Sequence, residues 1–103
     1  MKKTFINKTS IEVLNVHHRS FLLEYAISKN VPIHIDTTPQ WVDIRFPNIS
    51  YIDGELTDSR ANKKEDPERE WITTDQWLEY CDNWVESQLK NLQLNQEYTA
   101  LLS

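Results

Sequence analysis

The residues of this chain with side chains suited to acid–base, nucleophilic or metal chemistry are three histidines, one cysteine and sixteen acids. His17, His18, His34 and Cys81 are all permitted zinc ligands. No pair of them has ligand spacing, because His17 and His18 are adjacent and would point about 100° apart on a helix. Cys81 lies among apolar residues at helical spacing, where a cysteine is usually a small core residue. The pattern therefore favours neither a metal site nor a Cys–His nucleophile, and it predicts no catalytic residue and no cofactor.

The most distinctive feature is a row of acids in the segment DQWLEYCDNWVE, residues 75–86. Four carboxylates follow one another at spacings of four, three and four, and they are called the acid row here: Asp75, Glu79, Asp82 and Glu86. On a helix they form one stripe about 16 Å long. We expect it to flank the buried face, with Tyr80 on the opposite border. The row is then a solvated flank, a surface that docks on basic residues of the same chain, or a binding surface for a basic partner.

Charge is unevenly divided along the chain, whose net charge is −5. Residues 1–52 hold six Lys/Arg and four acids, a balance of +2, whereas residues 53–103 hold five Lys/Arg and twelve acids, a balance of −7. An acidic half argues against direct nucleic-acid binding by that surface and for a basic partner. Within the chain, the basic residues that we expect to be able to meet the acid row are Arg19, Lys29 and Arg45.

Aromatic residues give a second set of candidates. Trp41 falls on the polar side of an expected strand, where it either covers the edge of the core or serves as an exposed anchor for a partner. An alternative use is nucleotide binding between protomers. In that interpretation Trp41 or Tyr51 stacks on the base, and Arg45 or Lys29 contacts the phosphate.

Composition excludes several classes of protein. One glycine among 103 residues excludes glycine-rich phosphate loops, which need several glycines in one turn. One cysteine excludes an internal disulfide, and an intracellular, reducing compartment is expected. No window approaches the roughly 20 apolar residues of a membrane helix, and MKKTFINKTS lacks the apolar run of a signal peptide. The length predicts a single domain over residues 1–103.

The first half of the chain predicts a helix followed by short strands. Apolar spacing favours a helix over residues 18–29, and the Thr9/Glu12 capping-box pattern would extend it back to residue 10. The alternative is that IEVLNV is a strand and that the helix begins near His18. From residue 31 apolar and polar residues alternate, as they do in a strand with one buried face. We therefore expect three or four antiparallel strands within 31–58, from the segments VPIHID, WVDIRF and ISYIDGEL. Asp53-Gly54 predicts a hairpin turn.

The second half predicts a charged loop and a long amphipathic helix. Residues 57–70 contain almost no apolar side chains and are expected to be exposed. Thr73 and Gln76 form a capping box with Ile72 and Trp77 at the staple positions, so a helix should run from there to about residue 94. Its expected buried seam is Leu78, Cys81, Val85, Leu89 and Leu92. The tail 95–103 is expected to fray or to pack through Tyr98 and Leu101.

Together these elements predict a single α+β domain. It has an N-terminal helix, a small antiparallel meander of three or four strands, and a C-terminal amphipathic helix packed on the sheet. The apolar residues on both sides of the first helix and the four tryptophans are compatible with a homodimer, because a small domain has little interior in which to bury them. The sequence does not decide between a monomer and a homodimer.

Residues 26–51, AISKNVPIHIDTTPQWVDIRFPNISY, resemble a short module of small phage-encoded proteins of unassigned function. In that module a helix ends, a strand of IxYR type follows, a tryptophan opens the next strand, and a Pro/Asn-Ser stretch precedes a Tyr-Arg strand. AISKN, VPIHI, WVDIRF and PNIS take these places here, although Asn30 replaces the usual glycine and no clear Tyr-Arg pair follows. The resemblance implies a phage origin and an accessory role, and it carries no catalytic residues.

The sequence therefore predicts a small acidic protein without enzymatic activity that binds and inhibits a basic host protein, one acting in defence or nucleic-acid handling, in the cytoplasm of the host cell. One alternative is an immunity-type inhibitor of a basic toxin nuclease. Another is a protein that sequesters a nucleotide.

Overall fold

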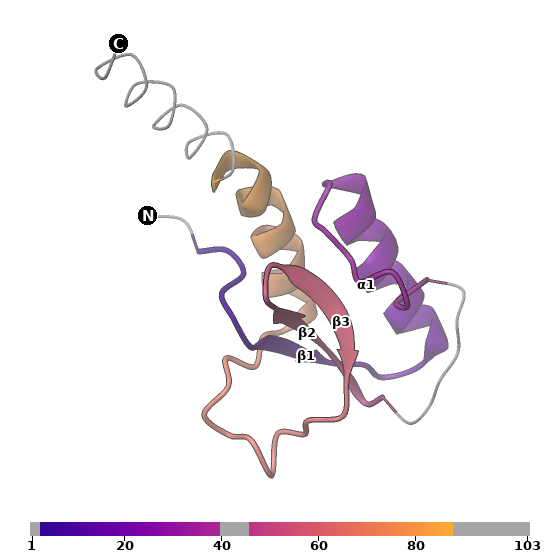
Figure 1. Ribbon diagram of the computed structural model, residues 1–103, viewed down its shortest axis with the longest axis vertical. Coiled ribbons are helices and arrows are strands. Elements are labelled where there is room, and N and C mark those ends of the chain that lie inside the picture. Colours follow the sequence, from indigo (N-terminus) through magenta and orange to yellow (C-terminus); the bar gives the residue numbers. More distant parts are fainter. Residues whose placement is uncertain (1–2, 40–45, 88–103) are drawn as a thin grey trace.

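A computed structural model describes residues 3–39 and 46–87 (Figure 1). In chain order the elements are β1 (Thr9–Glu12), α1 (Val16–Ser28), β2 (Asn48–Ile52) and β3 (Glu55–Ser59). A C-terminal helix follows, described over residues 74–87. The three strands form an antiparallel sheet in the order β1-β2-β3. Two helices with a small antiparallel sheet confirm the α+β class. No helix within the described ranges has the length and apolar character needed to cross a membrane.

Residues 9–15 decide between the two interpretations of the N-terminal segment. They form β1 and a short connection, so the Thr9/Glu12 capping box is wrong as a helix start. Helix α1 begins at Val16, where the Asn15 side chain accepts a hydrogen bond from the His18 amide at 2.9 Å. The strand forms because β2 supplies a partner for its backbone, with Ile11 opposite Ile49. A capping pattern cannot reveal such a partner 38 residues away.

The hairpin between β2 and β3 is confirmed. Ile52 lies opposite Glu55, and the two-residue turn places Asp53 at φ 51° and Gly54 at φ 88°. A turn with two positive φ angles matches the twist of the flanking strands, and Asp-Gly adopts it at little cost.

The expected strand at 31–36 is wrong. Only Ile33 forms a bridge, with Leu56 of β3, through bonds from the His34 amide to the Leu56 carbonyl and from the Leu56 amide to the Pro32 carbonyl, both 2.8 Å. Pro32 has no amide hydrogen to extend a ladder. Ile35, expected to be buried, is 87% exposed. The third strand of the sheet is therefore β1, and the expected strand WVDIRF lies outside the described residues except for Phe46.

The start of the C-terminal helix follows the prediction. The Thr73 amide donates to Gln76 Oε1 at 2.9 Å and the Gln76 amide donates to Thr73 Oγ1 at 3.2 Å, which is a reciprocal capping box. Ile72 and Trp77 are both buried. Leu89, Leu92 and the tail 95–103 lie outside the described residues.

The buried face of this helix differs from the expected seam. Trp77, Tyr80 and Cys81 are buried, whereas Leu78 and Val85 are only half-buried. Phe5 packs on this face, with its ring edge-on to Trp77 at 5.1 Å and to Tyr80 at 5.7 Å between ring centroids. Aromatic side chains remove more apolar area from water than leucine or valine, so they take the central positions.

The two faces of the sheet are covered differently. The apolar face, with Ile11, Ile49 and Leu56, packs into the core that holds both helices. The polar face lies under the charged loop, which spans 60–70 because residues 57–59 belong to β3. There Ser10 Oγ lies 2.7 Å from Ser50 Oγ, and Arg69 Nη1 donates to Ser50 Oγ at 3.3 Å. The loop, expected only to be exposed, thus covers buried hydroxyl groups.

Candidate functional site

The acid row lies on the outer side of the C-terminal helix. All four carboxylate residues, Asp75, Glu79, Asp82 and Glu86, are exposed. At about 100° per residue they lie roughly opposite the buried Trp77–Tyr80–Cys81 face. The expectation that they flank the core-facing surface is therefore wrong. The helix buries Trp77 and Tyr80 in place of the expected Leu78 and Val85, so it is rotated about its axis relative to the predicted orientation. The rotation presents the whole row to solvent.

Helix α1 reaches this row at one point. Lys29 Nζ lies 3.2 Å from Asp82 Oδ1, and the Tyr25 hydroxyl donates to the same oxygen at 2.8 Å. Lys29 Nζ also lies 5.6 Å from the centroid of the Tyr25 ring. Of the three basic residues expected to meet the acid row, Lys29 does so. Arg19 pairs with Asp58 instead, and Arg45 lies outside the described residues. Within ranges 3–39 and 46–87, neither Asp75 nor Glu79 has an ion-pair partner.

The aromatic edge of this surface comes from α1. Phe21 is exposed and its ring centroid lies 6.3 Å from that of Tyr25, which contacts Asp82. The i, i+4 spacing of Phe21 and Tyr25 is the sequence signal of this pair. It does not reveal which element the pair faces. That follows from the packing of the helices, in which the Trp77 indole N–H donates to the Leu22 carbonyl at 3.0 Å.

We expect the Tyr25→Phe variant to raise the pKa of Asp82, which is lowered in the folded protein by the Tyr25 hydrogen bond, the largest single cause, and also by Lys29. A carboxylate with a lowered pKa stabilises the fold above its unfolded-state pKa, and this contribution disappears as pH falls through the folded-state pKa. The variant should therefore lose less stability on acidification than the wild type. Carboxyl carbon chemical shifts followed by NMR against pH measure the pKa.

The matched comparison is Lys29→Met. It should also raise the pKa of Asp82, because Lys29 lowers that pKa both through a hydrogen bond and through its charge. An Asp82 titration that is the same in Tyr25→Phe and wild type would show that this hydrogen bond is not formed in solution.

The remaining predicted site residues have other environments. Tyr80 is buried and its hydroxyl donates to Glu70; burial, and then this bond, raises the pKa of Tyr80 to about 12. Tyr80 is therefore not available to a partner. Tyr51 stacks on Phe5 at 5.3 Å. Trp41 lies outside the described residues, as Arg45 does. The alternative nucleotide set is consequently not brought together by the described part of the chain, since Lys29 binds Asp82 and Tyr51 packs on Phe5.

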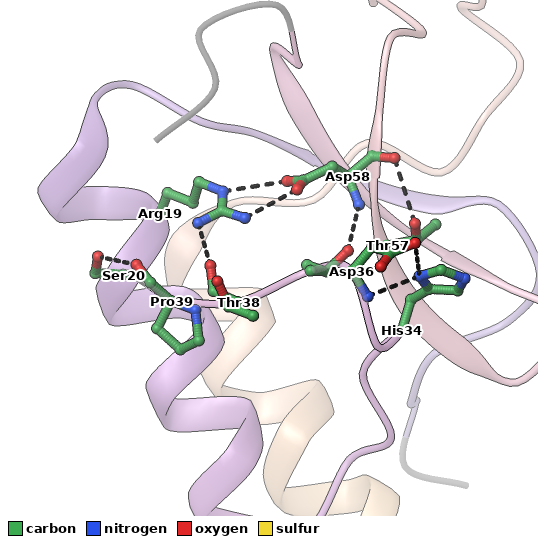
Figure 2. Close-up of polar contacts among 9 residues, drawn as sticks. Arg19, Ser20, His34, Asp36, Thr38, Pro39, Thr57 and Asp58 are labelled. Carbon is green, nitrogen blue, oxygen red and sulfur yellow. Dashed lines mark hydrogen bonds and ion pairs between the residues drawn. The ribbon is translucent and has the colours of Figure 1, made fainter. Parts of the chain in front are cut away.

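A buried ion pair, not foreseen from the sequence, joins α1 to the sheet. The Arg19 guanidinium donates to both carboxylate oxygens of Asp58, through Nε at 3.1 Å and Nη2 at 2.8 Å, and Nη1 donates to the Thr38 carbonyl at 2.6 Å (Figure 2). The two side chains are only 6% and 7% exposed. Ser20 Oγ donates to the Pro39 carbonyl at 2.7 Å. This cluster fixes residues 37–39 against α1 and β3.

A cavity of about 520 Å³ adjoins this pair, lined by His34, Asp36, Thr37, Phe46, Thr57 and Asp58. His34 Nδ1 accepts a hydrogen bond from the Asp36 amide at 3.1 Å, which places the ring proton of the neutral form on Nε2, 4.0 Å from Glu55. No group of three His, Cys, Asp or Glu side chains within the described residues is arranged to hold a metal ion. Burial raises the pKa of the Cys81 thiol to about 12, which opposes thiolate formation at neutral pH.

Comparison of the chain with protein-family models, with curated proteins and with solved structures returned no match.

Proposed function

We propose that the protein is a non-catalytic binding protein whose acid row, together with Phe21 and Tyr25 of α1, receives a basic protein partner. The observation that carries this proposal is the exposure of all four carboxylate residues on the side of the C-terminal helix opposite its buried face. A strip of one sign of charge attracts an oppositely charged partner and orients it during encounter.

The contact between Lys29 and this surface indicates what the surface can bind. A lysine ammonium group there lies close to a carboxylate oxygen of Asp82 and to the ring of Tyr25. Carboxylates supply the charge for such a contact, and an aromatic ring adds cation–π attraction. Asp75 and Glu79 offer the same carboxylate chemistry to a partner's Lys or Arg side chains. Phe21 offers an adjacent apolar contact.

The partner class in this proposal is a basic host protein, which a phage accessory factor would bind and inhibit in the cytoplasm of the host cell. The resemblance of residues 26–51 to the phage module supports that setting. The alternative with the same surface chemistry is an immunity-type inhibitor of a basic toxin nuclease. The two differ in which protein the acid row retains, so one experiment addresses both.

The experiment is capture from a bacterial lysate with wild-type protein and with the triple variant Asp75→Asn, Glu79→Gln, Glu86→Gln. Asp82 is left intact because it binds Tyr25 and Lys29. The matched control removes three exposed charges elsewhere, with Asp53→Asn, Glu65→Gln and Glu68→Gln. We expect a basic protein to be retained by wild type and control, lost by the triple variant, and released as salt is raised, because ionic screening weakens exposed charge contacts. Equal capture by all three proteins, or no capture, would contradict the proposal.

A further inference from the structure

Two cavities meet at Trp71, on the side of the molecule formed by the loop 60–70 and the edge of β1. They measure about 360 Å³ and about 190 Å³, and both are lined by Glu12, Lys63 and Trp71. The larger one adds Asn48, Asn62 and Lys64 among its lining residues. The surface is called the Trp71 groove here. Small-molecule sites commonly have volumes of roughly 300–1,000 Å³, so the groove has room for one small ligand.

The indole of Trp71 is held in place by its own polar atom and by its backbone neighbours. Its N–H donates to the Asp66 carbonyl at 2.8 Å. On either side of it, the Ser10 amide donates to the Glu70 carbonyl at 2.8 Å and the Ile72 amide donates to the Ser10 carbonyl at 2.9 Å. The indole is only half-buried, although its N–H is satisfied. A ring positioned in this way is pre-organised for stacking, because a ligand would not have to order it.

The residues that line the larger cavity carry a small excess of positive charge, although the loop 60–70 as a whole has four basic and four acidic residues. Lys63 and Lys64 line the larger cavity, are exposed, and have no ion-pair partner in the part of the chain that the structure describes. Among the described residues that line the two cavities, Glu12 is the one acid. The loop backbone is held by Asn62, whose side-chain oxygen accepts from the Glu65 amide at 2.9 Å, and by a hydrogen bond from the Asn48 side chain to the Ala61 carbonyl.

We propose that the Trp71 groove binds a small anionic ligand with a planar ring, of the nucleoside monophosphate class. The ring stacks on Trp71, and Lys63 and Lys64 contact the phosphate oxygens. Stacking on an aromatic ring is available to every base, and lysine serves as a point charge for phosphate. This site uses none of the residues of the acid row. A failure of the ligand proposal would therefore leave the proposed protein partner unaffected, and the reverse also holds.

The test is a titration of the full chain, followed by two-dimensional ¹H–¹⁵N NMR, with adenosine 5′-monophosphate, adenosine and inorganic phosphate. The four tryptophans give separate indole N–H signals. We expect saturable binding of the monophosphate, with the largest shifts at the Trp71 indole and at the amides of residues 61–64. Adenosine and phosphate, which each satisfy half of the site, should bind at least tenfold more weakly.

The Lys63→Gln, Lys64→Gln variant should weaken monophosphate binding at least tenfold. The matched control is Lys3→Gln, Lys8→Gln, which removes the same charge from exposed lysines that line neither cavity, and it should bind within about twofold of wild type. Trp71→Phe should retain weakened binding, because the smaller ring still stacks. The absence of saturable binding at millimolar monophosphate would overturn the proposal. Equal binding by both double variants, or shifts centred away from Trp71, would also overturn it.

Discussion

Replacing Asp58 by alanine should lower the free energy of unfolding by about 3–5 kcal/mol, because it removes one partner of a buried ion pair, the carboxylate that binds the Arg19 guanidinium. Both side chains are almost completely buried, and the pair is held by two parallel hydrogen bonds. The hydrogen bond from Arg19 to the Thr38 carbonyl does not replace the two bonds to the carboxylate that the substitution removes. Urea denaturation monitored by circular dichroism gives the free energy of unfolding.

A double variant separates the cost of removing one ion of the pair from the contribution of the whole pair. Arg19→Met, Asp58→Leu should recover most of the stability lost in Asp58→Ala, since apolar residues of similar volume avoid the desolvation of both ions. Lys29→Met, which breaks the half-exposed contact with Asp82, is the control and should have a much smaller effect. A loss in Asp58→Ala as small as that in Lys29→Met would show that the Arg19–Asp58 pair is solvated.

Replacing Trp77 by alanine should lower the free energy of unfolding by about 3–5 kcal/mol, the usual loss for a large aromatic side chain removed from a core. Trp77 is fully buried, packs against Phe5, and donates its indole N–H to the Leu22 carbonyl of α1. It therefore joins the C-terminal helix both to the N-terminal segment and to α1. The same denaturation experiment measures the loss.

The hydrogen bond from the Trp77 indole to the Leu22 carbonyl can be examined with Trp77→Phe. This variant should lower the free energy of unfolding by about 1–3 kcal/mol, because it loses both packing and the indole N–H donor. Trp84→Phe is a matched control. Its indole nitrogen is buried and has no hydrogen-bond partner among the described residues, so the change removes no such bond. Trp84→Phe should therefore cost less than Trp77→Phe. An equal or larger cost for Trp84→Phe would contradict a stabilising role for the bond to Leu22.

The elements that could be predicted from the sequence depend on contacts between near neighbours. The Asp53-Gly54 turn and the Thr73/Gln76 capping box each involve residues no more than three positions apart, and both were predicted correctly. Helix α1 begins two residues before the predicted range 18–29 and ends one residue before the end of that range. The agreement is close because apolar spacing along a helix is a local pattern.

The errors arose where a distant partner decides the outcome. Residues 9–12 contain a capping-box pattern and yet form a strand, because β2 offers a hydrogen-bonding edge. Residues 31–36 alternate in the manner of a strand, yet one bridge to Leu56 is all that forms. In both segments the local pattern fits two structures, and pairing with a remote strand selects one of them.

The candidate surfaces show the same division. The sequence by itself determined the spacing of the acid row, the uneven charge of the two halves and the absence of a glycine-rich phosphate loop. Only the tertiary structure decided that the acid row faces solvent, because the opposite face of the C-terminal helix packs Trp77 and Tyr80 against Phe5. The tertiary structure also places Lys29 against Asp82 and Arg19 against Asp58. It places Lys63 and Trp71 in the lining of the same two cavities. The physical reason is that spacing along a chain specifies which side chains share a face, whereas long-range packing decides what that face meets.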